Sequence, residues 1–289
     1  MPVFESPGRA AILGAGLIGM DLADRIHLSP RLALGLVAGR SAQSSGLVQA
    51  AARGYATSSQ GLAAVVERGP FDVVFDASNA SAHESHWQAL RATGATLIDL
   101  TPTELGTFVV PTVNAEQAAG SRHINLISCG GQASIPILNA LGGRCRPSYI
   151  EVVCTGASGS AGRATRLNLD EYIDTTQSAI RAFTRTPEVK VLVNLTPARP
   201  APPFRVVMTV LAPELPSTAA TAAVEAAAEQ VRSFAPGYAV TSIEPAPGCL
   251  TVAVEVTALG GRIPACAGNL DIINAAALLL AEHRTLPTR

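Results

Sequence analysis

The sequence predicts an α/β protein with two domains: a doubly wound parallel sheet, followed by an α+β domain with a mixed or antiparallel sheet. Two patterns support this prediction. Over the first 128 of the 289 residues, short apolar runs alternate with helical stretches, as in parallel strands joined by crossover helices. Beyond residue 128 the apolar runs are longer and fewer helices separate them.

The first part contains six apolar runs that we interpret as parallel strands. They lie at residues 9–13, 32–37, 71–76, 95–99, 107–110 and 123–127. Helical stretches between them are expected at residues 16–26, 43–53 and 82–93. Parallel strands need such long crossovers, whereas antiparallel strands do not.

The second part has strands and helices in a different proportion. Strands are expected at residues 149–153, 189–193, 204–210 and 250–256, and helices at residues 169–183 and 217–233. A last helix, near residues 270–283, is expected to return to the first domain. We therefore predict one domain from residues 1–128 plus 267–289 and another from residues 129–266.

Composition and charge exclude several classes of function. The formal net charge is −1, from 21 basic and 22 acidic residues, so no overall field favours nucleic acid or a membrane. Aromatic residues make up 4% of the chain, too few for a surface that stacks bases. No apolar run approaches the roughly 20 residues of a transmembrane helix, and no signal-peptide pattern is visible. We expect neither nucleic acid nor a membrane as partner.

The cysteines indicate a reducing compartment. There are five, an odd number, and no two have CxxC spacing. They are Cys129, Cys145, Cys154, Cys249 and Cys266. A chain of this length does not need disulfide staples, so we expect a cytoplasmic protein with free thiols.

A glycine pattern follows the first predicted strand and opens the first predicted helix. Gly14, Gly16 and Gly19 form GxGxxG in the setting that a dinucleotide site requires. The glycines permit a tight turn, close approach of a pyrophosphate, and packing of helix on strand, while the helix N-terminus attracts the anion. The residues expected to line this Rossmann-type cofactor site are Gly14, Ala15, Gly16, Leu17, Ile18 and Gly19.

The end of the second predicted strand bears on the choice of cofactor. NAD sites usually carry an acidic residue here, but this segment contains Arg40 and Ser41 and no carboxylate. An arginine and a hydroxyl suit the 2′-phosphate of NADP. NADP is therefore slightly favoured over NAD; in the alternative interpretation, Arg40 stacks on the adenine or lies in solvent.

Cys129 lies where a predicted strand ends, and two glycines separate it from a helix expected to begin near Ser134. Backbone N–H groups and a helix N-terminus at such a turn favour thiolate, and the same N–H groups can stabilise an oxyanion on a carbon bonded to the sulfur. Cys129 is therefore a candidate nucleophile. A buried structural cysteine is the alternative, and we interpret the other four cysteines in that way.

Residues 156–168 form a stretch rich in glycine and hydroxyl groups before a helix. Arg163 and Arg166 within it suit a phosphate or ribose, although a flexible loop is the alternative. Asn168 is expected to cap the helix, with Asp170 and Glu171 in its first turn.

Two histidines raise the question of a metal site. His83 and His86 lie three residues apart on a predicted helix, but no further ligand spacing supports metal binding. We expect both to be solvated and predict no metal.

With these motifs the chain resembles the acylating, CoA-dependent acetaldehyde dehydrogenases, the partners of 4-hydroxy-2-oxovalerate aldolase. The resemblance runs through nearly the whole chain in order. Its most specific segments are Ser128-Cys-Gly-Gly-Gln-Ala-Ser-Ile-Pro136 and Ile263-Pro-Ala-Cys-Ala-Gly-Asn-Leu-Asp-Ile272. The stretches at residues 14–19, 75–83, 97–102, 160–162, 165–166 and 168–171 also match.

The resemblance implies that Cys129 forms a thiohemiacetal and then an acyl thioester with a short aldehyde. NAD or NADP would accept the hydride, and coenzyme A would take the acyl group as co-substrate. It also implies a homodimer or higher oligomer and a possible aldolase partner. The cofactor would be lined by Ala15–Ile18 and by Ser160, Ala161, Gly162, Arg163, Ala164, Thr165, Arg166, Leu167, Asn168 and Asn269.

One departure from the family leaves alternatives open. Members usually carry an aspartate after the arginine that matches Arg205, whereas this chain has Val206 there. That aspartate is thought to help proton transfer near the thiol. Two alternatives to the acylating dehydrogenase are therefore considered. One is a reductase of another activated acyl group, like the semialdehyde dehydrogenases, and the other an inactive cofactor-binding partner subunit.

Overall fold

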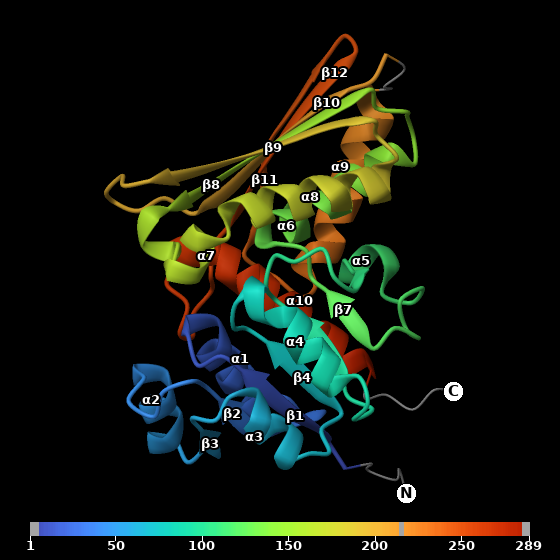
Figure 1. The fold of residues 1–289 in the computed structure, drawn as a ribbon. Helices are drawn as coiled ribbons and strands as arrows, with labels where there is room; N and C mark the ends of the chain where they lie inside the picture. The colour runs from blue at the N-terminus through green and yellow to red at the C-terminus, as the bar shows by residue number, and fades with distance from the viewer. Residues whose placement is uncertain (1–5, 214–216, 285–289) are drawn as a thin grey trace, which may run out of the picture. The chain divides into compact units, whose positions relative to one another are not determined.

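The computed structural model describes residues 6–213 and 217–284, and the side chains of Arg163, Ala164 and Ser217 lie outside the description (Figure 1). The chain separates into two compact units. Unit 1 comprises Met1–Thr107, Glu116–Asn125 and Ala277–Arg289, and unit 2 comprises Phe108–Ala115 and Leu126–Ala276. Each unit is described by itself.

The first sheet, which belongs to unit 1 apart from one edge residue, has seven strands in the order β3-β2-β1-β4-β5-β7-β6. All recorded pairings among the first six of these strands are parallel. The strands are β1 Gly8–Leu13, β2 Leu32–Ala38, β3 Thr57–Ser58, β4 Val73–Asp76, β5 Thr96–Asp99, β6 Thr107–Phe108 and β7 His123–Asn125. The expected doubly wound parallel sheet is confirmed.

Four helices of unit 1 connect these strands. They are α1 Leu17–Leu28, α2 Ser45–Ala52, α3 Leu62–Glu67 and α4 Ala80–Leu90. Helix α1 packs against β1 and β2, and α4 packs against β5. Apolar residues of the strands, among them Leu13, Leu36, Val74 and Leu97, form a buried core under the helices.

Unit 2 contains a five-stranded sheet in the order β11-β12-β10-β8-β9. The pair β8–β9 is parallel and the other three pairs are antiparallel, so the sheet is mixed, as predicted. The strands are β8 Tyr149–Ala157, β9 Glu188–Thr196, β10 Phe204–Leu211, β11 Tyr238–Ala246 and β12 Cys249–Val256.

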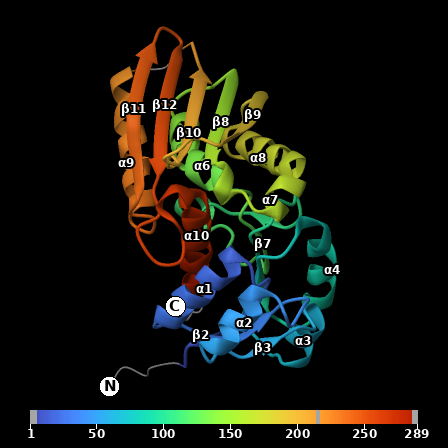
Figure 2. The ribbon, with the colours of Figure 1, turned by 90° about the vertical axis from the view of Figure 1, so that its left-hand side faces the viewer.

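The helices of unit 2 cover one face of that sheet. Helices α6 (Cys129–Gly142), α8 (Leu169–Thr184) and α9 (Ser217–Arg232) lie side by side behind the strands in Figure 2. Their apolar faces and the inward residues of β8, β10 and β12 form one buried core. The remaining elements are α5 Pro111–Asn114, η1 Ser158–Ser160, α7 Arg163–Leu167, η2 Ala265–Ala267 and α10 Gly268–Arg284.

The opposite face of the unit 2 sheet carries an apolar row. Val207 of β10 is paired with Val153 of β8, which is paired with Leu192 of β9. All three side chains are at least partly exposed, and 38% of Leu192 is accessible. An apolar row on an open sheet face is typical of an interaction surface.

Several predicted boundaries were wrong. Strand β11 and the pair β3–α3 were not predicted, because their short or mixed sequences lack a clear apolar period. The helix expected near Ser134 begins at Cys129, and the strand before it ends at Asn125 rather than residue 127. The units also differ from the predicted domains, since residues 108–115 and the first half of α10, up to Ala276, pack with unit 2.

Helix α10 is long and apolar enough to be compared with a membrane span. With the preceding turn it forms the segment Ala265–Arg284, whose most apolar window has a mean hydropathy of 1.3. However, 72% of its most apolar window is buried inside the protein, which is typical of a core helix.

The turn after β1 depends on glycine at two positions. Gly14 has φ +106°, a left-handed conformation, and a Cβ there would lie 2.4 Å from the carbonyl oxygen of Ala77. A Cβ on Gly19 would lie 1.9 Å from the carbonyl oxygen of Gly14. Gly14 therefore allows the turn after β1 to approach the chain that follows β4, and Gly19 allows α1 to pack closely on that turn.

We expect Gly19→Ala to destabilise the protein by about 1–3 kcal/mol, because backbone must move to admit one methyl group. The thermal unfolding midpoint should fall by several degrees. Gly120→Ala is the matched control: Gly120 is exposed and a Cβ there meets nothing within 4 Å. Equal midpoints for the two variants would contradict the close packing.

Candidate active site

Cys129 is the first residue of α6, and local backbone geometry sets its position. Ser128 caps the helix, and its Oγ accepts a hydrogen bond from the Gly131 N–H at 2.9 Å. Ile127, just before the cap, has φ +66°, a strained conformation for a β-branched residue. At Ile127 the chain leaves the extended direction of the strand, and α6 begins two residues later. The thiol therefore lies at the helix N-terminus.

The hydroxyl of Tyr172, from α8, lies beside the thiol. Tyr172 Oη is 3.5 Å from Cys129 Sγ and accepts a hydrogen bond from the Gly130 N–H at 2.8 Å. A Cβ on residue 130 would lie 2.4 Å from this Oη and 2.6 Å from the Sγ of Cys154, on β8. Only glycine at position 130 permits this approach. Sequence reasoning missed Tyr172, since nothing in its local pattern marks it.

Two opposing effects act on the pKa of the Cys129 thiol. Burial raises it, while hydrogen bonds from Tyr172, from the backbone N–H groups of Gly130 and Cys129, and from Asn269 lower it; the balance leaves the pKa raised. Burial also raises the pKa of Cys154 to about 12. In the free protein, therefore, Cys129 is a neutral thiol surrounded by donors that stabilise its charged form.

The expected oxyanion donors are engaged in the structure. The N–H of Gly130 donates to Tyr172, that of Gly131 to the Ser128 side chain, and that of Gln132 to the Ser128 carbonyl oxygen. In the structure these N–H groups hold the hydroxyl of Tyr172 and the cap in place, and their role as oxyanion donors stays a prediction.

Asn269, in the first turn of α10, contacts the thiol of Cys129. Its side chain hydrogen-bonds to Cys129, and it is 6% exposed. Its Oδ1 is buried and has no hydrogen-bond partner in the structure. An orphaned buried carbonyl oxygen beside a nucleophile suits a ligand donor such as a carboxamide N–H. The cofactor role of Asn269 stays a prediction.

Residues 158–168 contain two short helical elements, η1 and α7. Arg166 donates to the carbonyl oxygens of Ala161 at 3.2 Å and Ser158 at 2.8 Å, so its guanidinium holds the segment together. Asn168 occupies the cap position of α8 as expected, without a side-chain capping bond, and Asp170 and Glu171 follow in the first turn. The side chains of Arg163 and Ala164 are outside the description.

The other predicted cofactor residues of this stretch differ in exposure. Ser160 is buried, with its Oγ donating to the Ala157 carbonyl oxygen at 2.8 Å. Ala161 is also buried, Gly162 and Leu167 are exposed, and Thr165 is half-buried.

The glycine turn of unit 1 fits a dinucleotide. Gly16 is the N-cap of α1 and carries no side chain over it, and a Cβ there would meet nothing within 4 Å. The first turn of α1 has no acidic residue. An open backbone cradle at a helix N-terminus without nearby carboxylates is suited to a pyrophosphate. Ala15, Leu17 and Ile18 complete this turn as predicted.

Arg40 and Ser41 follow directly after β2 and Gly39. Arg40 is exposed, and Ser41 Oγ donates to the Gln43 side chain at 3.1 Å. The carboxyl edge of a parallel sheet is where such folds bind ligands. No carboxylate occurs between Val37 and Ser45.

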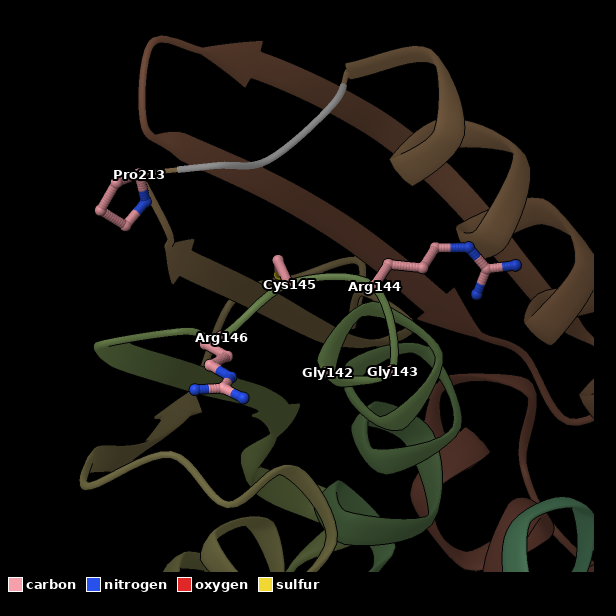
Figure 3. Close-up of a pocket in the computed structure, with 6 residues that line it drawn as sticks. All are labelled: Gly142, Gly143, Arg144, Cys145, Arg146 and Pro213. Atoms are coloured by element: carbon pink, nitrogen blue, oxygen red, sulfur yellow. The ribbon is translucent and has the colours of Figure 1, made fainter.

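A separate pocket of about 560 Å³ lies at the other end of α6 (Figure 3). It is lined by Gly142, Gly143, Arg144, Cys145, Arg146 and Pro213. Arg144 donates to the Ala140 carbonyl oxygen, and the two arginines point in different directions. This pocket has no convergent polar groups and does not belong to the site around Cys129.

Comparisons with known proteins find relatives over almost the whole chain. Residues 129–264 match the family model "Prokaryotic acetaldehyde dehydrogenase, dimerisation". An acetaldehyde dehydrogenase of Streptomyces griseus is 49% identical over 273 residues, covering 94% of this chain and 89% of the relative. One from Pectobacterium atrosepticum is 42% identical over 282 residues, covering 95% and 94%.

This chain belongs to the acetaldehyde dehydrogenase family. The family resemblance predicted from the sequence is confirmed. In fold, the chain is also similar to an aspartate semialdehyde dehydrogenase II of Vibrio cholerae, with a TM-score of 0.61 and 15% identity, covering 95% of this chain and 98% of that one. The α/β fold class is thereby confirmed.

Val206, where the acetaldehyde dehydrogenase family was expected to have an aspartate, is an apolar core residue. It is fully buried in β10 and paired with Cys154. The side chain at this position therefore provides no proton donor, and the hydroxyl of Tyr172 lies in contact with both thiols.

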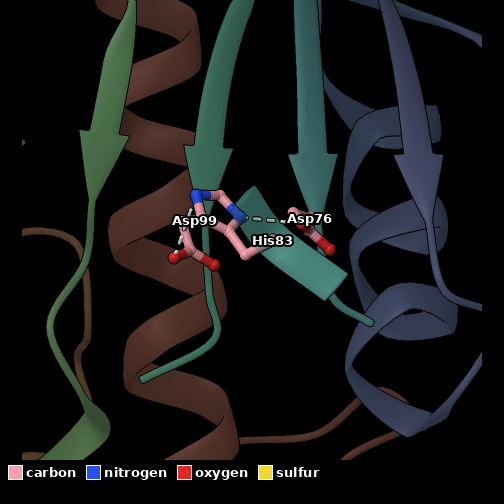
Figure 4. Close-up of side chains that lie close together, drawn as sticks. All are labelled: Asp76, His83 and Asp99. Carbon is pink, nitrogen blue, oxygen red and sulfur yellow. Dashed lines mark hydrogen bonds and ion pairs between the residues drawn. The ribbon is translucent and has the colours of Figure 1, made fainter. Parts of the chain in front are cut away.

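A buried cluster in unit 1 overturns the expectation that His83 and His86 are solvated. Both histidines are buried, and each ring Nδ1 is within hydrogen-bond distance of Asp76 Oδ2, at 2.8 Å and 2.6 Å. His83 Nε2 lies 2.8 Å from His123 Nε2 and 3.3 Å from Asp99 Oδ2. Figure 4 shows His83 between the two carboxylates, which end strands β4 and β5. The sequence could not show this, because the carboxylates come from other elements.

The cluster is a closed hydrogen-bond network. Asp76, His83 and Asp99 have ligand-type atoms within 4.8 Å of one another, which is the spacing of a metal site. Hydrogen bonds at 2.6–3.3 Å already engage those atoms, so the groups satisfy one another without an ion.

The protonation states follow from these contacts. Hydrogen bonds from the two histidines hold the pKa of Asp76 well below its usual range, against its burial. Burial lowers the pKa of His83, but the hydrogen bond to Asp76 and the charges of Asp99 and Asp76 outweigh it and leave that pKa raised. Burial raises the pKa of Asp99 to about 7. Burial and the charge of His83 lower the pKa of His123 to about 4. We infer that His83 is the cation and His123 its neutral hydrogen-bond acceptor. The ring of His123 is stacked on that of Trp87, with the ring centroids 4.3 Å apart.

We expect His123 to make the protein acid-sensitive between pH 6.5 and 4. An unfolded histidine gains its proton near pH 6.5 and folded His123 only near pH 4, so folded-state stability is full above this window and falls as the pH drops through it. Asp99 has the opposite effect on stability, because its raised pKa makes the folded state more stable as the pH falls, and Asp99 is still present in the His123 variant. Urea midpoints of His123→Gln should therefore fall less than those of wild type between pH 7 and 4.5. His27→Gln, at an exposed position, should follow wild type; parallel curves for all three would refute the role of His123.

Proposed function

We propose that this chain is an acylating acetaldehyde dehydrogenase that converts a short aldehyde, coenzyme A and NAD(P)⁺ into acyl-CoA and NAD(P)H, reversibly. The observation that carries the proposal is Cys129 at the start of α6, with Tyr172, Asn269 and backbone N–H groups directed at its sulfur. Membership of the family agrees with it. The exact acyl chain is a further proposal; acetyl is the first choice because the relatives are named for acetaldehyde.

The chemistry at Cys129 has two parts. The Cys129 thiol loses its proton to solvent, and the thiolate bonds to the aldehyde carbonyl carbon, whose oxygen becomes an alkoxide. This deprotonated thiohemiacetal becomes a thioester when its carbon loses a hydride, and a bound nicotinamide would be the hydride acceptor. Coenzyme A, as a thiolate that has lost its proton to solvent, then bonds to the acyl carbon, and Cys129 leaves as thiolate, which the surrounding donors stabilise.

We propose cofactor contacts for residues of each unit, taken separately. In unit 1 the turn Gly14–Gly19 would hold the pyrophosphate, with Arg40 and Ser41 at the adenosine ribose. In unit 2 the segment Ser160–Asn168 and Asn269 would contact the nicotinamide half. The support is the open glycine turn, the absence of a carboxylate after β2, and the orphaned Oδ1 of Asn269.

Assembly and location are also part of the proposal. The open sheet face with Val153, Leu192 and Val207 is suited to a homodimer, in agreement with the dimerisation model matched by residues 129–264. An aldolase partner would receive or supply the aldehyde. All five cysteines are free, which favours the reducing cytoplasm.

We expect Cys129→Ala to lower aldehyde-dependent NAD(P)⁺ reduction with coenzyme A by at least about 10⁴-fold, because the nucleophile is lost. Mass spectrometry after incubation with acetyl-CoA should find an acetyl group on Cys129 in wild type. Cys249→Ala, which removes a partly exposed thiol, should retain activity. Activity with acyl phosphates alone, or acylation of another residue, would contradict the proposal.

We expect NADPH to be used with higher kcat/KM than NADH, and Arg40→Ala to lower kcat/KM for NADPH about tenfold, since a charge-assisted bond to the 2′-phosphate is lost. The value for NADH should change little. Arg31→Ala, an exposed arginine of the same unit, is the control. A wild-type preference for NADH, unaffected by either variant, would reject Arg40 as a determinant.

A further inference from the structure

We propose that Tyr172 is a second catalytic residue, whose hydroxyl donates a hydrogen bond to Cys129 Sγ each time that sulfur carries negative charge. The proposal rests on Cys129 being the nucleophile of the proposed function. Tyr172 contacts the reacting atom itself, at 3.5 Å, from a different helix.

The hydrogen bonds of the Tyr172 hydroxyl favour donation towards sulfur. Tyr172 Oη already accepts the Gly130 N–H at 2.8 Å. A phenol has a single proton, and here that proton has the sulfur of Cys129 or that of Cys154 as its acceptor. A thiolate accepts much more strongly than a thiol, so ionisation of Cys129 draws the proton towards it.

The hydroxyl is held firmly in this place. Tyr172 is 7% exposed. Thr176, one turn later in α8, donates from Oγ1 to the Tyr172 carbonyl oxygen at 2.5 Å, and the same Oγ1 lies 2.7 Å from Ser128 Oγ. Ser128 in turn caps α6. The turn of α8 that carries Tyr172 is thereby joined to the turn of α6 that carries Cys129, so the donor needs little reorganisation.

Tyr172 acts as a donor and not as a base. The titratable groups that face it are Cys129 on α6 and Cys154 on β8. Burial and these two thiols raise the pKa of Tyr172 well above its usual value, so it keeps its proton while Cys129 ionises. Cys154, whose pKa is about 12, remains a neutral thiol.

The stabilisation that Tyr172 gives to Cys129 depends on the charge on the sulfur, which changes through the reaction. It is largest for the thiolate, before attack on the carbonyl and again when the acyl group has left. It is small for the thioester, whose sulfur is a weak acceptor. Tyr172 therefore favours departure of Cys129 as well as its attack, in both directions of the reaction.

The test compares Tyr172→Phe with Tyr238→Phe. Tyr238 is also fully buried in unit 2, and its hydroxyl donates to the Ala133 carbonyl oxygen at 2.7 Å, away from the thiol. The rate of Cys129 alkylation by iodoacetamide is measured against pH in the full-length protein without cofactor, with the modified peptide quantified by mass spectrometry. The apparent pKa of Cys129 should rise by about one unit in Tyr172→Phe, as expected for the loss of one charge-assisted bond. It should not change in Tyr238→Phe.

Kinetics give a second readout. The acidic limb of the pH profile of kcat/KM with acetyl-CoA should shift upwards by the same amount in Tyr172→Phe, and kcat should fall about tenfold or more at neutral pH while KM changes little. An unchanged alkylation profile in a folded Tyr172→Phe protein would overturn the proposal. Should that variant not fold, wild type containing 3-fluorotyrosine replaces it: a stronger phenol donor should lower the apparent pKa of Cys129, and no shift would overturn the proposal.

These measurements separate the two proposals. If acetyl-CoA and the other acyl donors give no turnover but the alkylation profile shifts as expected, the proposed function fails and the role of Tyr172 on the thiol stands. If turnover is seen and the alkylation profile is unchanged, the reverse holds.

Discussion

The first turn of α6 depends on one close approach, that of Tyr172 Oη to the backbone of Gly130. Because residue 130 has no side chain, the hydroxyl of α8 reaches the N–H at 2.8 Å and lies beside Cys129. The cap by Ser128 and its contact with Thr176 hold the two helices at this separation. The same few contacts between α6 and α8 therefore set the position of the thiol, place a hydrogen-bond donor beside it and bury part of it. A change in one of these contacts affects all three properties.

Much of the fold could be predicted because it depends on local pattern. The parallel strands of unit 1 are short apolar runs bounded by turns, and the glycines at 14 and 19 mark backbone positions that admit no Cβ. Cys129 was identifiable because the sequence places its thiol at the turn from a predicted strand to a predicted helix, directly before two glycines. Strand β11 was missed, since Tyr238–Ala246 alternates irregularly and contains a register shift.

The rest of the site could not be predicted, because it is made by residues distant in sequence. Tyr172 is 43 residues from Cys129, and its neighbours in sequence indicate an ordinary amphipathic helix. His83 and His86 have helical spacing that is common on solvated faces, but Asp76 precedes them at a strand end and His123 comes from β7. Burial of these polar groups is decided by tertiary packing, which local pattern does not encode.

The backbone conformation of Ile127 limits which residues can replace it. A β-branched residue at φ +66° costs of order 1–3 kcal/mol relative to a relaxed conformation, and glycine would remove most of that cost. Yet Ile127 is fully buried, and its side chain lies against Gly131, so it also fixes the angle at which the chain enters the helix. Glycine would relieve the backbone strain but would leave a cavity in the core, and truncating a buried isoleucine costs about 2–5 kcal/mol. Burial of the side chain therefore outweighs the strain of the backbone, and the two are retained together at the residue immediately ahead of the helix cap and the nucleophile.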